Sequence, residues 1–216
     1  MDEIIARLSE VFTEPLPGWE AQSRMINYDR PKVSDVRKID PQARRSAVMA
    51  LLYPKNNTLH TVLMLRNSYR GTHSGQVSFP GGKSEEWDKS LWHTALREAR
   101  EEVGIQPKTV RKIGELTPVY IPPSRFLVFP FLAITNKAPT FIPDPLEVNR
   151  IIETPVAVFM DPKNRKQKKL FVSGVQNELE VAYFDVDCET VWGATAMILS
   201  EISELIKNAK INLSNF

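Results

Sequence analysis

The chain has 216 residues, of which 42% are hydrophobic and 25% are charged, and its formal net charge is +2. This length suits one domain with a sizeable core, and so small a net charge gives no reason to expect nucleic acid or a membrane surface as a partner. Cys188 is the single cysteine. An intrachain disulfide is therefore excluded, which fits a reducing compartment.

The first residues, MDEIIARLSEVF, lack the basic segment and apolar core of a signal peptide. No window approaches the roughly 18 consecutive apolar residues that a membrane span requires. We therefore expect a cytoplasmic protein without a membrane partner.

Residues 2–12 carry apolar side chains at helical spacing and predict a short amphipathic helix, which the PLPG segment at 15–18 ends. Residues 19–40 are polar and irregular, and we expect them to wrap over the body of the protein. On this interpretation residues 1–45 form an N-terminal helix and wrapping segment of a single domain that covers residues 1–216.

Two apolar runs at 46–53 and 60–66, separated by the turn residues PKNN, predict a β-hairpin. A loop rich in glycine and small polar residues follows at 67–83. A helix is then expected from about residue 89 to 103, because Gly104 stands where helices commonly end.

The second half reads mostly as strands. Segments rich in β-branched and aromatic residues predict strands at 112–120, 126–134, 155–160 and 178–186. A last amphipathic helix is expected from about 189 to 208, with one apolar face made of Val191, Thr195, Ile198, Ile202 and Leu205. The pattern predicts an α/β protein with a mixed sheet between helices.

The helix predicted at 89–103 is unusually acidic at its end, in the stretch REAREEVGI. Glu98, Glu101 and Glu102 are neighbours at helical spacing, on an arc beside an apolar stripe formed by Trp92, Ala95, Leu96, Ala99 and Val103. Like charges so close need a positive partner, and Mg²⁺ is typically held by carboxylates of this kind. The upstream turn FPGGK at 79–83 lets backbone approach a ligand closely.

The segment GGKSEEWDKSLWHTALREAREEVGI closely resembles the Nudix box, whose pattern is Gly, five residues, Glu, seven residues, then Arg-Glu-apolar-any-Glu-Glu-any-Gly-apolar. The second half matches at every defined position, from Arg97 to Ile105. The first half departs from the pattern, because Gly82 to Arg97 is one residue longer and Asp88 stands nearest the first glutamate position.

The extra residue is typical of one branch, the coenzyme A pyrophosphatases, which also carry a signature resembling LLTxRS, a short loop and GQVxFPGG. This chain has LMLRNSYRGTHSGQVSFPGG at 63–82. Asn67 replaces the usual serine, and Gly71 stands where an arginine is often found. The residues in register are Arg66, His73, Gly75, Gln76, Phe79, Pro80, Gly81 and Gly82.

The resemblance implies a Nudix-like α/β/α sandwich that hydrolyses a nucleoside diphosphate linked to another moiety, with Mg²⁺ or Mn²⁺ as cofactor. The implied substrate is coenzyme A, giving 4′-phosphopantetheine and 3′,5′-ADP. The implied metal ligands are Glu98, Glu101, Glu102 and the carbonyl of Gly81, with Arg97 holding the glutamates. The implied substrate-binding residues are Arg66, His73, Gln76 and Gly82.

Several alternatives stay open. The catalytic base is Glu101 in the box or a later residue, Glu147 or Glu153. The basic run KNRKQKK at 163–169 is either a solvated loop or a loop that recognises the 3′-phosphate of coenzyme A. Rival functions are hydrolysis of ADP-ribose or dinucleoside polyphosphates, and nucleotide sensing without catalysis. A homodimer is also left open.

Overall fold

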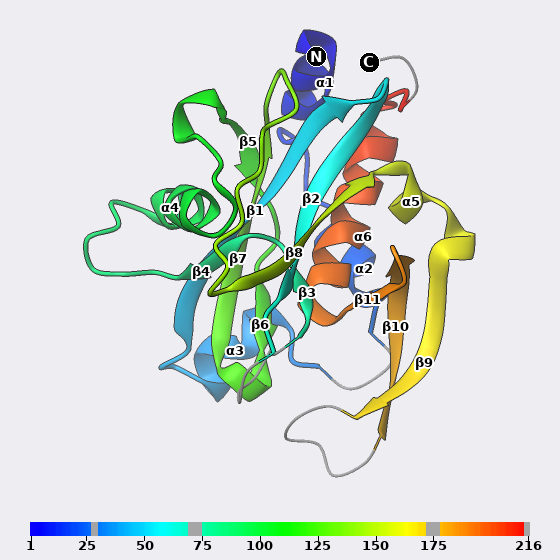
Figure 1. Ribbon diagram of the computed structural model, residues 1–216. Coiled ribbons are helices and arrows are strands. Elements are labelled where there is room, and N and C mark those ends of the chain that lie inside the picture. Colours follow the sequence, from blue (N-terminus) through cyan, green and yellow to red (C-terminus); the bar gives the residue numbers. More distant parts are fainter. Residues whose placement is uncertain (27–29, 69–74, 172–177, 214–216) are drawn as a thin grey trace.

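The computed structural model of the protein describes residues 1–26, 30–68, 75–171 and 178–213 (Figure 1). Its α-helices are α1 (Asp2–Val11), α2 (Gly18–Ser23), α3 (Val33–Ile39), α4 (Leu91–Val103), α5 (Ala157–Met160) and α6 (Gly193–Asn208). Its strands are β1 (Arg44–Lys55), β2 (Thr58–Arg66), β3 (Val77–Ser78), β4 (Gly81–Lys83), β5 (Arg111–Glu115), β6 (Val119–Ile121), β7 (Phe126–Ile134), β8 (Val148–Pro155), β9 (Arg165–Phe171), β10 (Glu178–Val186) and β11 (Glu189–Trp192).

The larger sheet has eight strands and is mixed, as predicted. Its main path is β3-β2-β1-β7-β5, and β4, β6 and β8 pair with β1, β7 and β2 respectively. The long central strands β1 and β7 run parallel. The predicted β1–β2 hairpin is confirmed, and Asn56 and Asn57 make its turn with φ of 51° and 58°, the left-handed conformation that asparagine tolerates in tight hairpin turns.

Strand β1 is buried on both faces, which explains its unbroken apolar sequence. Ala47, Met49 and Leu51 belong to a core cluster with α4, whereas Ala50 and Leu52 belong to a second cluster with α1 and α6. Alternate side chains of a strand point to opposite faces. Figure 1 shows α4 and α6 on either side of the sheet, so the predicted α/β/α sandwich is confirmed.

A second, antiparallel sheet has the order β11-β10-β9 and lies beside α6 (Figure 1). Phe184 of β10 packs edge-on against Phe159, with ring centroids 5.2 Å apart. At the start of α6, the Thr195 hydroxyl donates to the carbonyl of Val77 on β3, at 3.0 Å. This contact fixes α6 and the second sheet next to the segment that carries the glycine turn.

Several expectations from the sequence are wrong in detail. The loop expected at 67–83 contains β3 and β4, and the strand expected at 112–120 is divided into β5 and β6. Within 19–40, predicted to be irregular, the structure has α2 and α3. Residues 155–160 are the end of β8 followed by α5, because Val156 and Phe159, three residues apart, both turn into the α6-side core. Residues 189–192 form β11 before α6 begins. Most of the basic run, residues 165–169, lies in strand β9, which pairs with β10, and residues 163–164 precede it in a short 3-10 helix.

Of the predicted face of the last helix, Thr195, Ile198, Ile202 and Leu205 lie on α6 and are each at most 8% exposed. Val191 is also buried, but it belongs to β11. Burial extends further round α6 and includes Glu201, whose side chain is fully buried. In the described part of the chain no helix combines the length and apolarity needed to cross a membrane.

Candidate active site at the acidic helix

The acidic helix α4 is held at both ends by local chemistry. Ser90 caps its N-terminus by accepting a hydrogen bond from the backbone N–H of His93, at 3.4 Å. Gly104 ends it with φ of 76°, where a side chain would also lie 2.9 Å from Ile142. The helix end predicted from Gly104 is confirmed. Ala95, Ala99 and Val103 are completely buried and seat the helix on β1 and β7.

The glycine turn lies directly against α4. Gly81 and Gly82 pair with Val48 and Ala47 of β1. A side chain on Gly81 would collide with the carbonyl oxygen of Ala47, and one on Gly82 would come within 2.5 Å of the carboxyl group of Glu98. Gly81 is therefore needed for the turn to pack on β1, and Gly82 leaves room for the carboxyl group of Glu98.

Glu102 is almost fully buried, at 2% exposure, and both of its carboxylate oxygens accept hydrogen bonds. The backbone N–H of Gly81 donates to one at 2.7 Å, and the guanidinium of Arg66 donates to the other at 2.9 Å. Burial raises the pKa of Glu102 to about 8, although Arg66 and Gly81 oppose this shift. Burial also raises the pKa of Glu98.

Arg97 is the hub of the ion pairs at this site. Its Nη1 donates to Glu98 at 2.7 Å and to Glu101 at 3.0 Å, and its Nε and Nη2 each donate to Asp88 at 3.0 Å. Asp88 is itself fixed by the hydroxyl of Thr94 at 2.9 Å. Hydrogen bonding from Arg97 lowers the pKa of Asp88 to about 2. Asp88, which departs from the box pattern, thus anchors the arginine that holds two box glutamates.

The three box glutamates do not all face the glycine turn. Glu98 and Glu102 contact the glycine turn, whereas the Glu101 side chain is 50% exposed and pairs with Arg97. Within the described ranges, no three His, Cys, Asp or Glu side chains form a group ready to hold a metal ion. Two arginines bind these carboxylates instead. Carboxylate oxygens beside a tight glycine turn are nonetheless the donors that Mg²⁺ and Mn²⁺ take, so the residues present fit such an ion.

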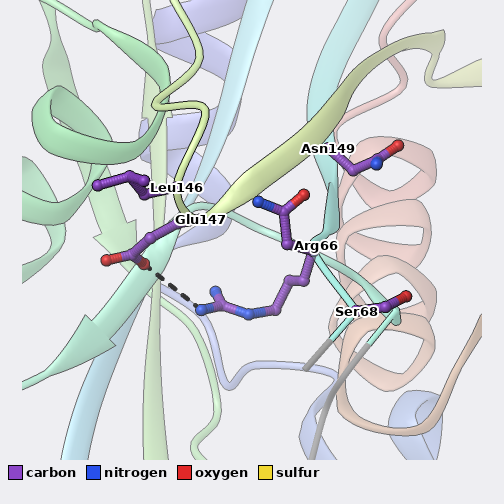
Figure 2. A pocket seen from close by; sticks show the side chains of 6 residues that line it. Arg66, Ser68, Leu146, Glu147 and Asn149 are labelled. Carbon is purple, nitrogen blue, oxygen red and sulfur yellow. Dashed lines mark ion pairs between the residues drawn. The ribbon is translucent and has the colours of Figure 1, made fainter. Parts of the chain in front are cut away.

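A pocket of about 720 Å³ opens beside this cluster (Figure 2). Its lining residues are Arg66, Asn67, Ser68, Leu146, Glu147 and Asn149. Figure 2 shows the Arg66 side chain directed at Glu147, with 3.5 Å between the charged groups. Since Arg66 also binds Glu102, it joins the pocket to the acidic helix. Sequence reasoning missed the pocket residues on the 144–149 segment, other than Glu147.

The segment leading to Glu147 is tied to the end of α4. The backbone N–H of Asp144 donates to the carbonyl of Glu102 at 2.9 Å. The Asp144 side chain in turn accepts from the N–H of Leu146 at 2.8 Å. The structure therefore brings Glu147 to the box, as part of a turn with fixed backbone.

Glu153, the other candidate from the later segment, points elsewhere. Its carboxylate accepts from the hydroxyl of Tyr53 at 2.9 Å and from Lys55 at 2.8 Å, at the far end of β1. Among the predicted substrate residues, Gln76 accepts a hydrogen bond at its carbonyl from the N–H of Arg66, at 3.0 Å. His73 lies outside the described residues.

The comparisons with known proteins agree with this fold and with the acidic helix. A family model described as the NUDIX domain matches residues 43–180, which include β1, the glycine turn, α4 and the 144–149 segment. The chain belongs to the Nudix family.

Curated relatives carry the same family name. The mitochondrial Nudix hydrolase 15 of Arabidopsis thaliana is 35% identical over 163 residues, covering 72% of this chain and 56% of that protein. The chloroplastic Nudix hydrolase 22 of the same plant is 34% identical over 170 residues, covering 76% and 55%. An uncharacterized Nudix hydrolase, NudL, of Yersinia enterocolitica is 32% identical over 147 residues, covering 68% and 74%. The chain thus spans about half the length of the two Arabidopsis relatives.

A solved structure supports the fold. The Nudix hydrolase RenU from M. smegmatis superposes with a TM-score of 0.50 at 13% sequence identity, covering 81% of this chain and 91% of that one. At this identity the likeness concerns the arrangement of helices and strands alone.

Proposed function

We propose that the protein is a metal-dependent Nudix hydrolase that cleaves a nucleoside diphosphate linked to another moiety. The observation that carries the proposal is the meeting of Glu98 and Glu102 with the Gly81–Gly82 turn, beside a pocket that Arg66 and Glu147 enter. Family membership supports the same reaction class. Retention of all three box glutamates argues against a sensor that has lost catalysis.

In this proposal Glu98, Glu102 and the carbonyl of Gly81 hold the cation, and Glu101 completes the set or orients the attacking water. A bound Mg²⁺ or Mn²⁺ supplies positive charge to the non-bridging oxygens of the diphosphate. Arg97, fixed by Asp88, keeps the carboxylate of Glu98 in place. Gly82 leaves the room beside Glu98 that any side chain would fill.

For the general base, Glu147 is the stronger of the two later candidates. It pairs with Arg66, which also contacts Glu102, and it lines the pocket. Glu153 is committed to Tyr53 and Lys55. Glu101 remains the alternative within the box, because its half-exposed carboxylate is accessible to water.

For the substrate, we propose coenzyme A or its derivatives, cleaved to 4′-phosphopantetheine and 3′,5′-ADP. The support is the upstream signature, in which Arg66, Gln76 and Gly82 adjoin the site and His73 is a further candidate. ADP-ribose and dinucleoside polyphosphates are the alternatives. A single domain and a cytoplasmic location stay predictions, and the two Arabidopsis relatives are named as mitochondrial and chloroplastic.

The test is a substrate panel with purified protein. Coenzyme A, 3′-dephospho-coenzyme A, ADP-ribose and diadenosine polyphosphates are incubated with Mg²⁺, with Mn²⁺, and with chelator, and the products are identified by mass. The proposal expects coenzyme A to give the two named products with metal and none with chelator. Consumption of ADP-ribose while coenzyme A survives would remove the coenzyme A assignment. If none of these diphosphates is hydrolysed with either metal, the proposal that the protein is a hydrolase is wrong.

A further inference from the structure

Arg66 stands between two acidic groups that belong to different parts of the site. It ends strand β2, where its backbone N–H donates to the carbonyl of Gln76. Its guanidinium lies 2.9 Å from Glu102 of the acidic helix and 3.5 Å from Glu147 of the pocket, and its side chain is 20% exposed. The positively charged Arg66 side chain therefore connects Glu102, a proposed metal ligand, with the pocket.

The two arginines of the site are anchored differently. Arg97 makes a two-bond contact with Asp88, which is outside the proposed metal ligands, so this anchor persists whatever the box glutamates bind. The carboxylates of Glu102 and Glu147, in contrast, both take part in the proposed reaction. Arg66 is thus paired with groups whose charge balance changes during function.

A divalent cation at Glu102 would compete with Arg66 for the same carboxylate. One Glu102 oxygen already accepts from Gly81, and the other accepts from Arg66. Two positive groups on one nearly buried carboxylate repel each other strongly, because the surrounding dielectric is low. The planar guanidinium, once displaced, matches the oxygens of a phosphate, which the adjoining pocket can admit.

We propose that Arg66 is a substrate-binding residue that exchanges partners. It neutralises Glu102 and Glu147 in the metal-free protein. When a divalent cation binds Glu102, the Arg66 side chain turns into the pocket and binds the diphosphate of the substrate. This inference rests on the proposed function. It assigns an order to the site: Arg66 would leave Glu102 when that carboxylate holds a cation, and would then be available to bind the diphosphate of the substrate.

The exchange can be observed directly by nitrogen NMR of the arginine side chains in ¹⁵N-labelled protein. The Arg66 signal is assigned as the one that disappears in Arg66→Lys. We expect slow guanidinium rotation in metal-free protein, faster rotation after saturating Mg²⁺, and slow rotation again after adding imidodiphosphate, a diphosphate that is not hydrolysed. Arg125, which pairs with Asp40 at 2.5 Å, is the internal control and should not change.

A binding measurement supplies the second readout. At fixed free Mg²⁺, Arg66→Met should weaken imidodiphosphate binding about tenfold relative to wild type, whereas without Mg²⁺ the two proteins should differ less than twofold. Arg125→Met should match wild type in both conditions.

Two results would contradict the exchange. One is an Arg66 signal that does not change when Mg²⁺ is added, and the other is an Arg66→Met variant that loses the same affinity for imidodiphosphate with and without Mg²⁺. The substrate panel separates this failure from that of the proposed function. If the protein cleaves coenzyme A normally while Arg66 stays paired with Glu102, the exchange is contradicted and the proposed function stands.

Discussion

At the scale of single residues, the site depends on how each carboxylate is held. Asp88 illustrates this, because it stands nearest the first glutamate position of the box, where the pattern has Glu, and makes a paired contact with Arg97. Arg97 then orients Glu98. Removing Asp88 should therefore affect both the stability of the protein and its turnover.

We expect Asp88→Asn to lower the free energy of unfolding by about 1 kcal/mol at pH 7, after discounting for solvent screening, and to reduce turnover about tenfold. The folded pKa of Asp88 is depressed to about 2 from 3.8. Its stabilisation is present above pH 3.8 and is lost as the pH falls through 2. Urea unfolding of both proteins from pH 7 to 2 should show the gap closing between about pH 4 and 2. A gap that is constant with pH would contradict this account, and Asp185→Asn, at a half-buried ion pair with Lys166, is the control.

The two later glutamates give a second test at this scale. We expect Glu147→Gln to lower kcat at least about tenfold with little change in KM, since it would remove a base beside the diphosphate. Glu153→Gln, on β8 beside the far end of β1, should leave kcat within about twofold. Steady-state kinetics with the best substrate of the panel decide the matter. A loss of kcat in Glu153→Gln alone would assign the role of base to Glu153, and a loss in neither variant would return it to Glu101.

At the scale of elements, the basic run at 163–169 has to be interpreted differently, because most of it forms strand β9 and not a loop. Lys166 pairs with Asp185 at 2.8 Å, and Lys168 bonds Thr190 and lies over the ring of Tyr183. β9 is an end strand of the second sheet and exposes Phe171 at its end, at 81%. Lysines on such edges hinder pairing with another chain.

Neutralising Lys166, Lys168 and Lys169 to Gln should therefore increase self-association at high protein concentration, measured by sedimentation velocity. The ratio of KM for coenzyme A to that for 3′-dephospho-coenzyme A should stay unchanged. A KM that rises for coenzyme A alone would instead show that this strand recognises the 3′-phosphate.

The sequence predicted elements well where one pattern dominates. The β1–β2 hairpin, α4 with its glycine end, and the apolar face of α6 all follow from local periodicity and turn residues. β9 was not predicted, because its sequence, RKQKKLF, lacks apolar alternation. α5 was not predicted, because four residues are too few to show a helical period. The sequence named the glutamates and glycines of the candidate site, and their functional roles stay predictions. The pairing of Arg66 with Glu102 joins residues 36 positions apart, which spacing within a motif does not predict.

At the scale of the whole molecule, a buried carboxylate ties the N-terminal segment to the rest. Glu201 of α6 accepts from Gln22 of α2 at 2.8 Å, and from the hydroxyl and N–H of Thr117 at 2.7 and 3.2 Å. Gln22 also donates to the carbonyl of Thr117 at 2.9 Å. All groups that meet Glu201 here are donors, so an acceptor-only side chain is required.

We expect Glu201→Gln to destabilise the protein by about 1–3 kcal/mol, because its amide N–H₂ would face another donor in a buried site. Glu204→Gln, on the same helix, removes a partly exposed ion pair with Arg24 and should cost less than about 1 kcal/mol. Chemical unfolding of both variants checks the difference. Equal costs would mean that this network does not fasten α2 to α6.

The central claim is that the acidic helix and the glycine turn form the active site for hydrolysis of a diphosphate. Turnover of coenzyme A by Glu102→Gln with Mg²⁺, measured alongside its unfolding free energy, tests that claim most directly. We predict a loss of at least about a hundredfold in kcat in a protein that still folds, whereas Glu153→Gln, also an ion-paired glutamate, keeps its activity. A folded Glu102→Gln variant that turns over coenzyme A at the wild-type rate would contradict the claim.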